Sequence, residues 1–339
     1  MEFQLPIKIN APEQQINYRD KILLTGSCFT EHIGNELEKL KFSVLQNPNG
    51  ILFDPVSVCN SLVSYIENKK YNEEDLFELN EIWHSWRHHS RFSNINPKEA
   101  VRIINESQQS AHEFLKDANW IIITLGSSFS YQLTETAIKT AEFSQKPPLG
   151  GLGVSNCHRA PAQWFNKHLL EISEIISMLE NCYHRLQQFN PGVNIIFTVS
   201  PVRHIRDGVV ENNRSKSRLI EAVHHIVNKF DRLYYFPAYE LVIDVLRDYR
   251  FYDIDLVHPN YMATEFVLEK FAQSCIDEAS QQLMQEIKKI VIARNHKAFQ
   301  PRTNAHHQFL SMNFQKVKTL KEKYPFLNLE EELTYFSGV

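Results

Sequence analysis

The chain has 339 residues, of which 43% are hydrophobic and 22% are charged, an ordinary composition for a globular protein with a sizeable core. The formal net charge of −4, without a basic stripe carrying interleaved aromatic residues, gives no case for a nucleic-acid partner. No apolar run approaches the roughly 20 residues of a membrane helix, and the N-terminus does not read as a signal peptide. The five cysteines form no CxxC pair, which favours a reducing, cytoplasmic location and argues against a disulfide framework.

Apolar runs typical of buried strands alternate with helical patterns along the chain. The predicted strands are 22–24, 120–125, 194–199 and 233–236. The predicted helices are 30–41, 98–118, 161–189, 215–230 and 260–280. Near-continuous apolar strands separated by helices indicate a mainly parallel sheet covered on both faces. The fold class is therefore α/β, a three-layer α/β/α sandwich.

Two regions interrupt this alternation, and a third follows it. Residues 42–97 form an insert rich in Asn, His and aromatic residues, and residues 131–160 form a Gly/Pro-containing loop. Long loops in a compact α/β domain commonly build the functional site. Residues 281–339 are predicted to be a helical, charged extension that serves packing or oligomerisation. We therefore expect one catalytic domain, 1–280, with 42–97 and 131–160 as site-forming inserts, followed by the extension.

Polar residues stand where the predicted strands end, which is where doubly wound sheets bind ligands. Ser27 and Cys28 follow the first strand, and Gly126 and Ser127 follow the second. Ser27 alone would usually be a helix N-cap. Cys28 is the rival nucleophile, because a helix N-terminus lowers a thiol pKa, yet a Cys beside an apolar Phe29 is more often buried.

Asp255 and His258 form the second informative feature. A spacing of three lets both side chains face one side of a turn, so that the carboxylate accepts from Nδ1–H and leaves Nε2 as a base. With Ser27, these residues can form a triad in the chain order Ser, Asp, His. The pattern indicates nucleophilic acyl transfer, which needs no cofactor.

The stretch Gly26-Ser27-Cys28-Phe29 resembles the block that names the GSCFA family, with Thr30 where that name has Ala. The resemblance runs through residues 20–275 and continues at Asn47 to Gly50, Thr124 to Gly126, Asn156 to His158, Ser200 to His204, and Arg247 to Tyr252 with Asp255 and His258. This family is similar to the SGNH/GDSL hydrolases, which act on acyl esters. The resemblance implies an SGNH-hydrolase-like fold, Ser27 as nucleophile, and Asp255 and His258 as its partners.

The resemblance also implies an oxyanion hole. Gly50, which otherwise reads as a turn glycine, falls at the block whose backbone N–H joins that hole, with Asn49 beside it. The third block, normally Gly-x-Asn-Asp, falls at Gly126-Ser127-Ser128, where the Asn is missing. Asn156, Ser127 or Ser128 are the candidates to replace it.

Other polar residues have weaker claims. His158, Arg203 and His204 are candidates for substrate contacts, although an ion pair of Arg203 with Asp248 or Asp255 is the commoner outcome. The segment 211–218 reads as the charged, solvated start of a helix.

The cluster His84, His88 and His89 admits a metal-binding interpretation, because His84 and His88 would share a helix face that Glu81 could join. The crowding of Trp and Arg in the same stretch favours packing or a cleft-lining role, so no metal site is predicted.

The sequence therefore predicts a serine esterase of the SGNH type acting on small acyl esters, with O-acetyl groups of a carbohydrate as one possible substrate. The alternatives are an acyltransferase with the same triad, or a non-catalytic or metal-dependent binding protein that uses His84, His88 and His158. The oligomeric state is left open.

Overall fold

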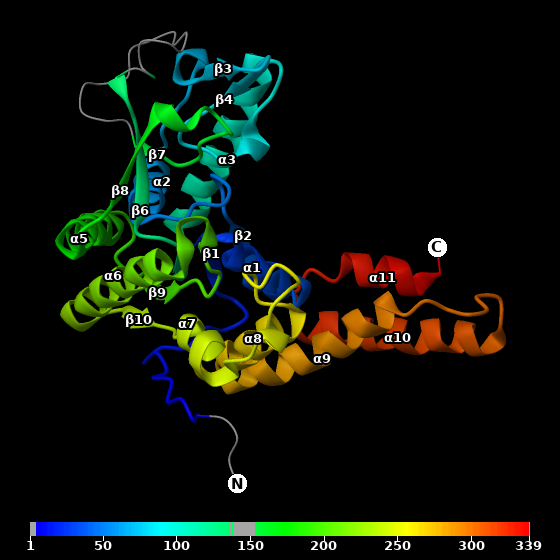
Figure 1. Ribbon diagram of the computed structural model, residues 1–339. Coiled ribbons are helices and arrows are strands. Elements are labelled where there is room, and N and C mark those ends of the chain that lie inside the picture. The colour runs from blue at the N-terminus through cyan, green and yellow to red at the C-terminus, as the bar shows by residue number, and fades with distance from the viewer. Residues whose placement is uncertain (1–4, 136, 138–152, 339) are drawn as a thin grey trace.

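The computed structural model describes residues 5–135, 137 and 153–338, and its centre is a five-stranded parallel sheet (Figure 1). The strands lie in the order β10-β9-β5-β1-β2, and every neighbouring pair is parallel. Their bounds are β1 Lys21–Gly26, β2 Ser43–Gln46, β5 Trp120–Leu125, β9 Asn194–Val199 and β10 Leu233–Tyr235. The side chains of β1 alternate between the two cores: Ile22 and Leu24 join one, and Leu23 joins the other.

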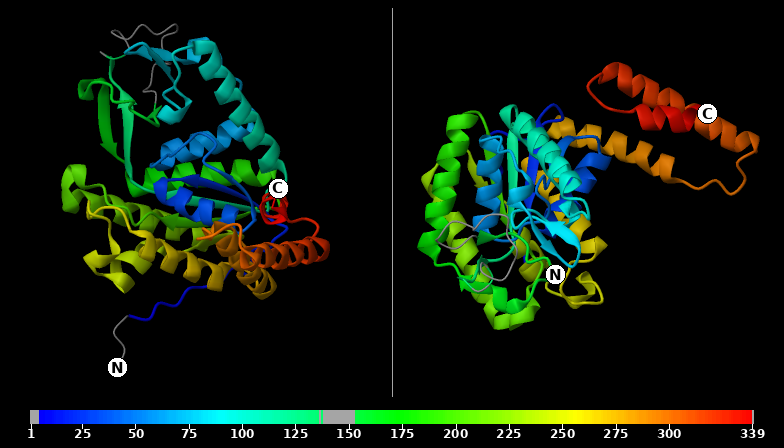
Figure 2. Two further views of the ribbon diagram at one scale, coloured as in Figure 1. Left: turned by 90° about the vertical axis from the view of Figure 1, so that its right-hand side faces the viewer. Right: turned by 90° about the horizontal axis from the view of Figure 1, so that it is seen from above.

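Helices cover both faces of the sheet, as Figures 1 and 2 show, so the predicted three-layer α/β/α class is confirmed. One face carries α1 (Cys28–Lys39), α7 (Ala238–Glu240) with the π-helical η5 (Leu241–Leu246), α8 (Tyr261–Cys275) and α9 (Glu278–Asn295). The other face carries α2 (Pro55–Ile66), α3 (Pro97–Lys116), α5 (Ile172–Phe189) and α6 (Gly208–Lys229).

Two small antiparallel sheets lie together at one end of the sandwich (Figure 1). One is the hairpin of β3 (Phe77–Leu79) and β4 (Ile82–His84). The other joins β7 (Gly153–Val154), β6 (Phe129–Leu133) and β8 (Phe165–Leu169). Because β6 starts soon after β5 ends, this layer stands at the carboxyl edge of the parallel sheet.

The predicted inserts are more regular than loops. The segment 42–97 contains β2, α2, β3 and β4, and also the short 3-10 helices η1 (Glu73–Asp75) and η2 (Ser90–Phe92). Pro55 at the first turn of α2 and the Asp54 side chain, which accepts from the Ser57 N–H, explain why α2 begins where it does. The segment 131–160 contributes to β6 and to β7, while residues 136 and 138–152 lie outside the described residues.

Three predicted helix boundaries were wrong. The helix expected over 161–189 begins only at Ile172, because residues 165–169 form β8, which pairs with β6. A long-range strand pairing here overrides local helical spacing. The helix expected over 215–230 starts at Gly208. The helix expected over 260–280 is divided into α8 and α9, since Asp277 caps a new helix by accepting from the Ser280 N–H.

The predicted helical extension is present as α9, α10 (Asn304–Lys323) and α11 (Glu330–Ser337), which project away from the sandwich (Figure 2). The buried carboxylate of Glu332 on α11 lies 2.9 Å from Lys41 Nζ and 2.7 Å from Arg294 Nη1, tying the extension to the segment between α1 and β2. The predicted division between a domain 1–280 and this extension stays a prediction. Within the described ranges, no helix combines the length and apolar character that a bilayer span requires.

Candidate active site

The order of the strands marks one crevice as the place for a ligand. The chain passes from β1 outward to β2 on one side, and then returns to β5, β9 and β10 on the other side. The connection therefore reverses direction between β1 and β5, and open α/β sheets bind ligands beyond the carboxyl ends of the strands at such a point. Ser27 follows β1, and Gly126 follows β5.

Ser27 stands between the last residue of β1 and the first residue of α1. Its side chain makes no capping hydrogen bond, although it occupies the N-cap position of that helix. Ser27 is 1% exposed, and its Oγ has no hydrogen-bond partner among the described residues. A buried hydroxyl without a partner costs about 1–3 kcal/mol, and the start of a helix favours developing negative charge. The position therefore suits a reacting group better than a structural cap.

Gly26 sets the direction of the chain at Ser27. Its φ is +138°, and its N–H donates to Asn47 Oδ1 at 2.9 Å, while its carbonyl accepts from the Leu52 N–H at 2.9 Å. A Cβ at this position would lie 2.1 Å from the Thr124 carbonyl oxygen on β5. Only glycine lets the two strand ends approach this closely. Asn47, which lies within the motif but was not singled out as a site residue, fixes this geometry.

Gly126 forms the opposite wall of the crevice. A Cβ on Gly126 would lie 3.4 Å from Ser27 Cβ and 3.3 Å from Phe53 Cδ1. The Phe53 ring meets the His204 ring edge-on, with the ring centroids 5.6 Å apart. Burial lowers the pKa of His204 to about 4. His204 therefore lies near the crevice as a neutral imidazole.

Asp255 and His258 have the predicted contact. Asp255 Oδ2 lies 2.6 Å from His258 Nδ1, and Oδ1 accepts the backbone N–H groups of Val257 and His258 at 2.9 and 3.0 Å. Hydrogen bonds from the His258 backbone, the His258 ring and Val257 hold the pKa of Asp255 at about 2. Because a carboxylate only accepts, Nδ1 carries the proton and Nε2 is free to act as a base.

The loop that carries Asp255 and His258 lies on the same side of the sheet as Ser27. The Arg203 N–H, just beyond β9, donates to the Val257 carbonyl at 3.3 Å. Helix α8, which starts three residues after His258, packs against α1, which starts one residue after Ser27. Val257, Cys28 and Phe29 belong to one apolar cluster. The catalytic roles of Ser27, Asp255 and His258 stay predictions.

The Gly50 N–H, which the resemblance assigns to the oxyanion hole, and the Ser27 N–H, which would join it there, are already engaged. The Gly50 N–H donates to the Asn47 carbonyl at 2.7 Å across a turn in which Gly50 has φ +82°. The Ser27 N–H donates to the Thr124 carbonyl at 3.1 Å. Asn49 is buried, and its Oδ1 has no partner among the described residues. The oxyanion roles of these residues stay predictions, and Gly50 and Ser27 would have to share their N–H groups with the substrate.

Ser127 and Ser128, which lie at the position of the third block, are hydrogen-bonded to Ser215 on helix α6. Ser127 Oγ lies 3.3 Å from Ser215 Oγ, which also accepts the Ser128 N–H at 2.8 Å. Ser128 Oγ donates to the Ser215 carbonyl at 3.1 Å. Ser127 and Ser128, two of the three candidates to replace the missing Asn, are thus turned toward α6.

The histidine cluster has structural partners. His84 lies on strand β4 and not on a helix, so the shared helix face that a metal-binding interpretation of His84 and His88 would require does not form. His158 Nε2 lies 2.9 Å from the Ser85 carbonyl, and its Nδ1 lies 3.2 Å from Ser90 Oγ. Burial lowers the pKa of His158 to about 4 and of His88 to about 3. Across the described ranges, no group of three or more His, Cys, Asp or Glu side chains is arranged to hold a metal ion.

Asn156 supports this cluster locally, because its Oδ1 accepts the His158 N–H at 2.8 Å. His89 joins the cluster to the crevice: its N–H donates to the Asn49 carbonyl at 2.9 Å, and its Cβ blocks any side chain at Gly50. The substrate-binding roles predicted for Asn156 and His158 stay predictions.

Arg203 does not make the predicted ion pair with Asp248 or Asp255. Its guanidinium lies over the Tyr252 ring, 4.2 Å from the centroid, and donates to the Leu256 carbonyl at 3.2 Å. Asp248 pairs with Arg250 instead, and Asp255 pairs with His258. Delocalised charge and planarity suit Arg203 to this stacking. Arg203 thus holds the loop that carries the Asp–His pair.

Cys28 is partly buried, and this burial raises the pKa of its thiol despite hydrogen bonds from the start of α1. A raised pKa disfavours the thiolate, which is the reactive form. The structure therefore gives Cys28 the environment of a packing residue.

The segment 211–218 was predicted to be solvated, and this was wrong for its central residues. Asn212, Ser215 and Lys216 are buried, and Lys216 Nζ lies 2.6 Å from both the Gly126 and Ser200 carbonyl oxygens. The signal was available: Lys216 precedes buried Leu219 and Val223 by three and seven positions, on one face of α6.

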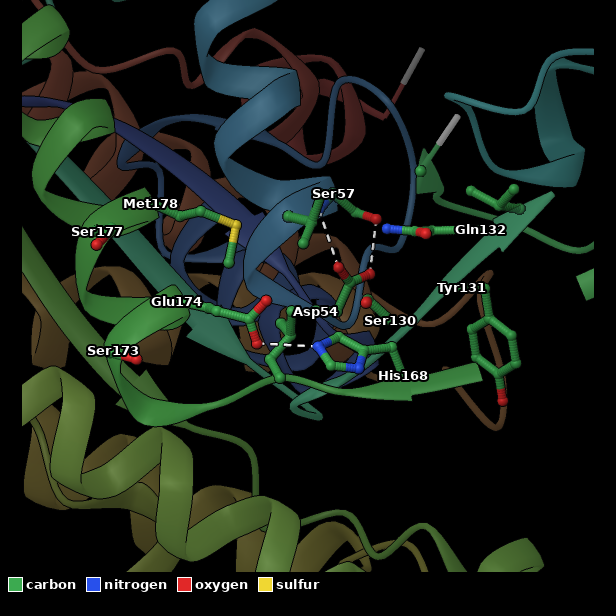
Figure 3. A pocket seen from close by; sticks show the side chains of 14 residues that line it. Asp54, Ser57, Ser130, Tyr131, Gln132, His168, Ser173, Glu174, Ser177 and Met178 are labelled. Carbon is green, nitrogen blue, oxygen red and sulfur yellow. Dashed lines mark hydrogen bonds and ion pairs between the residues drawn. The ribbon is translucent and has the colours of Figure 1, made fainter. Parts of the chain in front are cut away.

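A cavity of about 490 Å³ lies behind the crevice, between α2, α5 and the sheet of β6 to β8 (Figure 3). Asp54, Ser57, Gln132 and the hydrogen-bonded pair His168 and Glu174 line it. Burial raises the pKa of Asp54 to about 6. Asp54 follows Phe53, whose carbonyl accepts the N–H groups of Gly126 and Ser127 at 2.7 and 3.0 Å, so the cavity and the crevice share one loop.

The fold is an α/β/α sandwich with a candidate ligand site at its strand switch point. Residues 21–271 match the GSCFA family, and residues 287–337 match the C-terminal domain of GSCFA domain proteins. The chain belongs to the GSCFA family.

Comparison with curated protein sequences found no match. Among solved structures, the chain is similar to a carbohydrate esterase family 3 protein from Talaromyces cellulolyticus, with 10% identity and a TM-score of 0.33 over 80% of this chain and 99% of that chain. It is also similar to the acetyl xylan esterase Est2A from the rumen bacterium Butyrivibrio proteoclasticus, with 11% identity and a TM-score of 0.33 over 77% of this chain and 66% of that chain.

Proposed function

We propose that the protein is a serine esterase that cleaves small acyl esters at Ser27. The observation that carries the proposal is the position of Ser27: a buried hydroxyl without a partner among the described residues, at the start of a helix and at the β1–β5 switch point. The hydrogen-bonded pair of Asp255 and His258 supports it. So does the resemblance of the GSCFA family to the SGNH/GDSL hydrolases.

The proposed reaction has two acyl-transfer steps. His258 Nε2 removes the proton from Ser27 Oγ, which attacks the ester carbonyl, while Asp255 holds the imidazole and stabilises its charge. The protonated His258 then donates to the leaving alcohol. In the second step, water gives a proton to His258 and attacks the acyl-enzyme, and the protonated His258 then returns that proton to Ser27 Oγ as the carboxylic acid leaves. Each step needs donors for the oxyanion.

The proposed substrates are esters with a short acyl group, and O-acetyl groups on a carbohydrate are the first to test. Ser27 is 1% exposed, so only a compact acyl group would reach it without a rearrangement of the covering residues. This burial also gives a reason to test the second candidate, an acyltransferase, since a covered acyl-enzyme excludes water and favours a bound acceptor alcohol.

The test is hydrolysis of p-nitrophenyl acetate by the wild-type protein and by Ser27→Ala. We expect the variant to fall to the background rate, because alanine has no Oγ to attack the ester, while Cys28→Ala, the adjacent control, retains activity. His258→Gln and Asp255→Asn should each lose most of the turnover with little change in KM. Full activity in Ser27→Ala would end the serine mechanism.

Two further measurements refine the assignment. His204→Gln separates the two histidines near the crevice: if it abolishes turnover while His258→Gln does not, His204 and not His258 is the base. Partition of the acetyl group between water and an added sugar alcohol, followed by mass spectrometry, decides between hydrolysis and transfer.

A further inference from the structure

Lys216 is a deeply buried cation that contacts the crevice. It lies on α6, is 1% exposed, and its Nζ lies 2.6 Å from the carbonyl oxygens of Gly126 and Ser200. These two residues directly follow the neighbouring strands β5 and β9, so the ammonium group bridges the two chains just beyond the strand ends. Burying a lysine costs several kcal/mol, and it is seldom found without paired or hydrogen-bonded partners. The two carbonyl oxygens are the hydrogen-bond partners that stabilise the buried Lys216 charge at this position.

Lys216 is linked to Ser27 through one residue, Gly126. Gly126, whose carbonyl it holds, is the residue that faces Ser27 Cβ across the crevice. Next to Lys216 on α6, Ser215 holds the Ser127 and Ser128 pair that stands where the third SGNH block would have its Asn. One turn of α6 thus supports this wall of the crevice.

We propose that Lys216 is a positioning residue for acyl transfer at Ser27: its ammonium group fixes the Gly126 wall and supplies a positive charge behind the nucleophile, where the third-block Asn is missing. This inference rests on the proposed function. The charge acts through space on the oxyanion that forms when Ser27 attacks, and Lys216 itself does not touch the substrate.

Lys216 interacts electrostatically with Cys28 and His204, which agrees with its position beside the crevice. Burial lowers the pKa of Lys216 to about 7, and the neighbouring Cys28 thiol opposes this shift. Burial raises the pKa of Cys28, the residue after Ser27, and the Lys216 charge opposes this rise; burial lowers the pKa of His204, and the Lys216 charge adds to that lowering. The groups that face Lys216 are thus Cys28 from α1, His204 after β9, and the two strand-end carbonyls.

The kinetic test compares Lys216→Met, Lys216→Arg and the wild type with p-nitrophenyl acetate across pH 5 to 9. Removing a pre-organised positive group is expected to lower kcat of the Met variant roughly 10- to 100-fold, with little change in KM. In the wild type, kcat/KM should fall as the pH rises through about 7, where Lys216 loses its proton. The Arg variant keeps its charge, so it should lose this basic limb.

A wild-type profile that stays level above pH 7 would overturn the electrostatic role, and this measurement does not depend on whether any variant folds. Lys229→Met serves as the matched control, because Lys229 lies on the same helix, is half-exposed and pairs with Glu180 at the surface. Circular dichroism of each variant checks the fold.

A second readout separates this inference from the esterase proposal. The pH dependence of Cys28 alkylation by iodoacetamide, followed by peptide mass spectrometry, measures whether the charge reaches the start of α1. The apparent pKa of Cys28 should be lower in Lys216→Arg, which keeps its charge at alkaline pH, than in Lys216→Met. If the two agree, the charge does not act at the crevice and the inference fails, even where the Ser27→Ala result supports the esterase. If they differ and no ester is cleaved, the esterase proposal alone fails.

Discussion

Substituting Gly26 with alanine should distort the crevice at its narrowest point. The added Cβ would lie 2.1 Å from the Thr124 carbonyl oxygen, about 1.3 Å inside the 3.4 Å at which ordinary van der Waals contact begins. The obstacle is backbone of a central strand, which cannot rotate away. An unfavourable φ of +138° adds strain. Overpacking and strain each cost about 1–3 kcal/mol, so we expect Gly26→Ala to destabilise the fold by roughly 3–5 kcal/mol.

The matched control is Gly208→Ala. Gly208 also has a positive φ, +87°, yet a Cβ there meets nothing within 4 Å among the described atoms. This variant should carry only the backbone strain, about 1–2 kcal/mol. Urea unfolding followed by circular dichroism at 25 °C gives both free energies. Equal destabilisation by the two substitutions would refute the argument that the β1–β5 approach requires glycine.

Two stability predictions concern buried carboxylates. Glu332→Gln should destabilise the protein by about 3 kcal/mol, because it removes the charge that pairs with Lys41 and Arg294. Glu331→Gln, at the exposed neighbouring residue, should cost under about 1 kcal/mol. Similar urea unfolding midpoints for the two variants would contradict this prediction. Since burial raises the pKa of Asp54 to about 6 from 3.8, the folded state binds its proton more tightly, and stability is lost as the pH rises from about 4 to 6. Asp54→Asn should therefore gain about 3 kcal/mol relative to wild type between pH 4 and 7 in urea unfolding, and parallel pH profiles would exclude this cost.

How far the fold could be predicted depended on which strands are central. The strands β1, β5 and β9 are continuous apolar runs, because helices cover both of their faces. The edge strand β2 is partly exposed and has the mixed sequence Ser-Val-Leu-Gln, so it carries no such run. Residues 165–169 have no strand signal of their own, since β8 exists through its pairing with β6. The local sequence pattern therefore identifies strands that are buried on both faces. It misses strands such as β2 and β8, which are partly exposed and form through pairing with a strand distant in the sequence.

The candidate site divides in the same way. The contact of Asp255 with His258 is local, three positions apart, and could be predicted from spacing alone. Lys216 could not be recognised as a site residue without the fold, because its partners Gly126 and Ser200 lie 90 and 16 positions away. Arg203 was assigned to an acidic partner, since charge is visible in a sequence, whereas the face of Tyr252 that it contacts is not.

In the proposed reaction, the occupied backbone donors would give nearby charged side chains a larger part in oxyanion stabilisation. If the Gly50 and Ser27 N–H groups remain bonded to the Asn47 and Thr124 carbonyls, each can offer the oxyanion only a shared hydrogen bond. A shared bond is longer and weaker than a direct one. The deficit would then be met by charge that needs no free donor, which a buried ammonium group supplies at short range in a low-dielectric surrounding. A crevice that lacks the third-block Asn and has engaged backbone donors thus favours a buried cation close by, and Lys216 lies there.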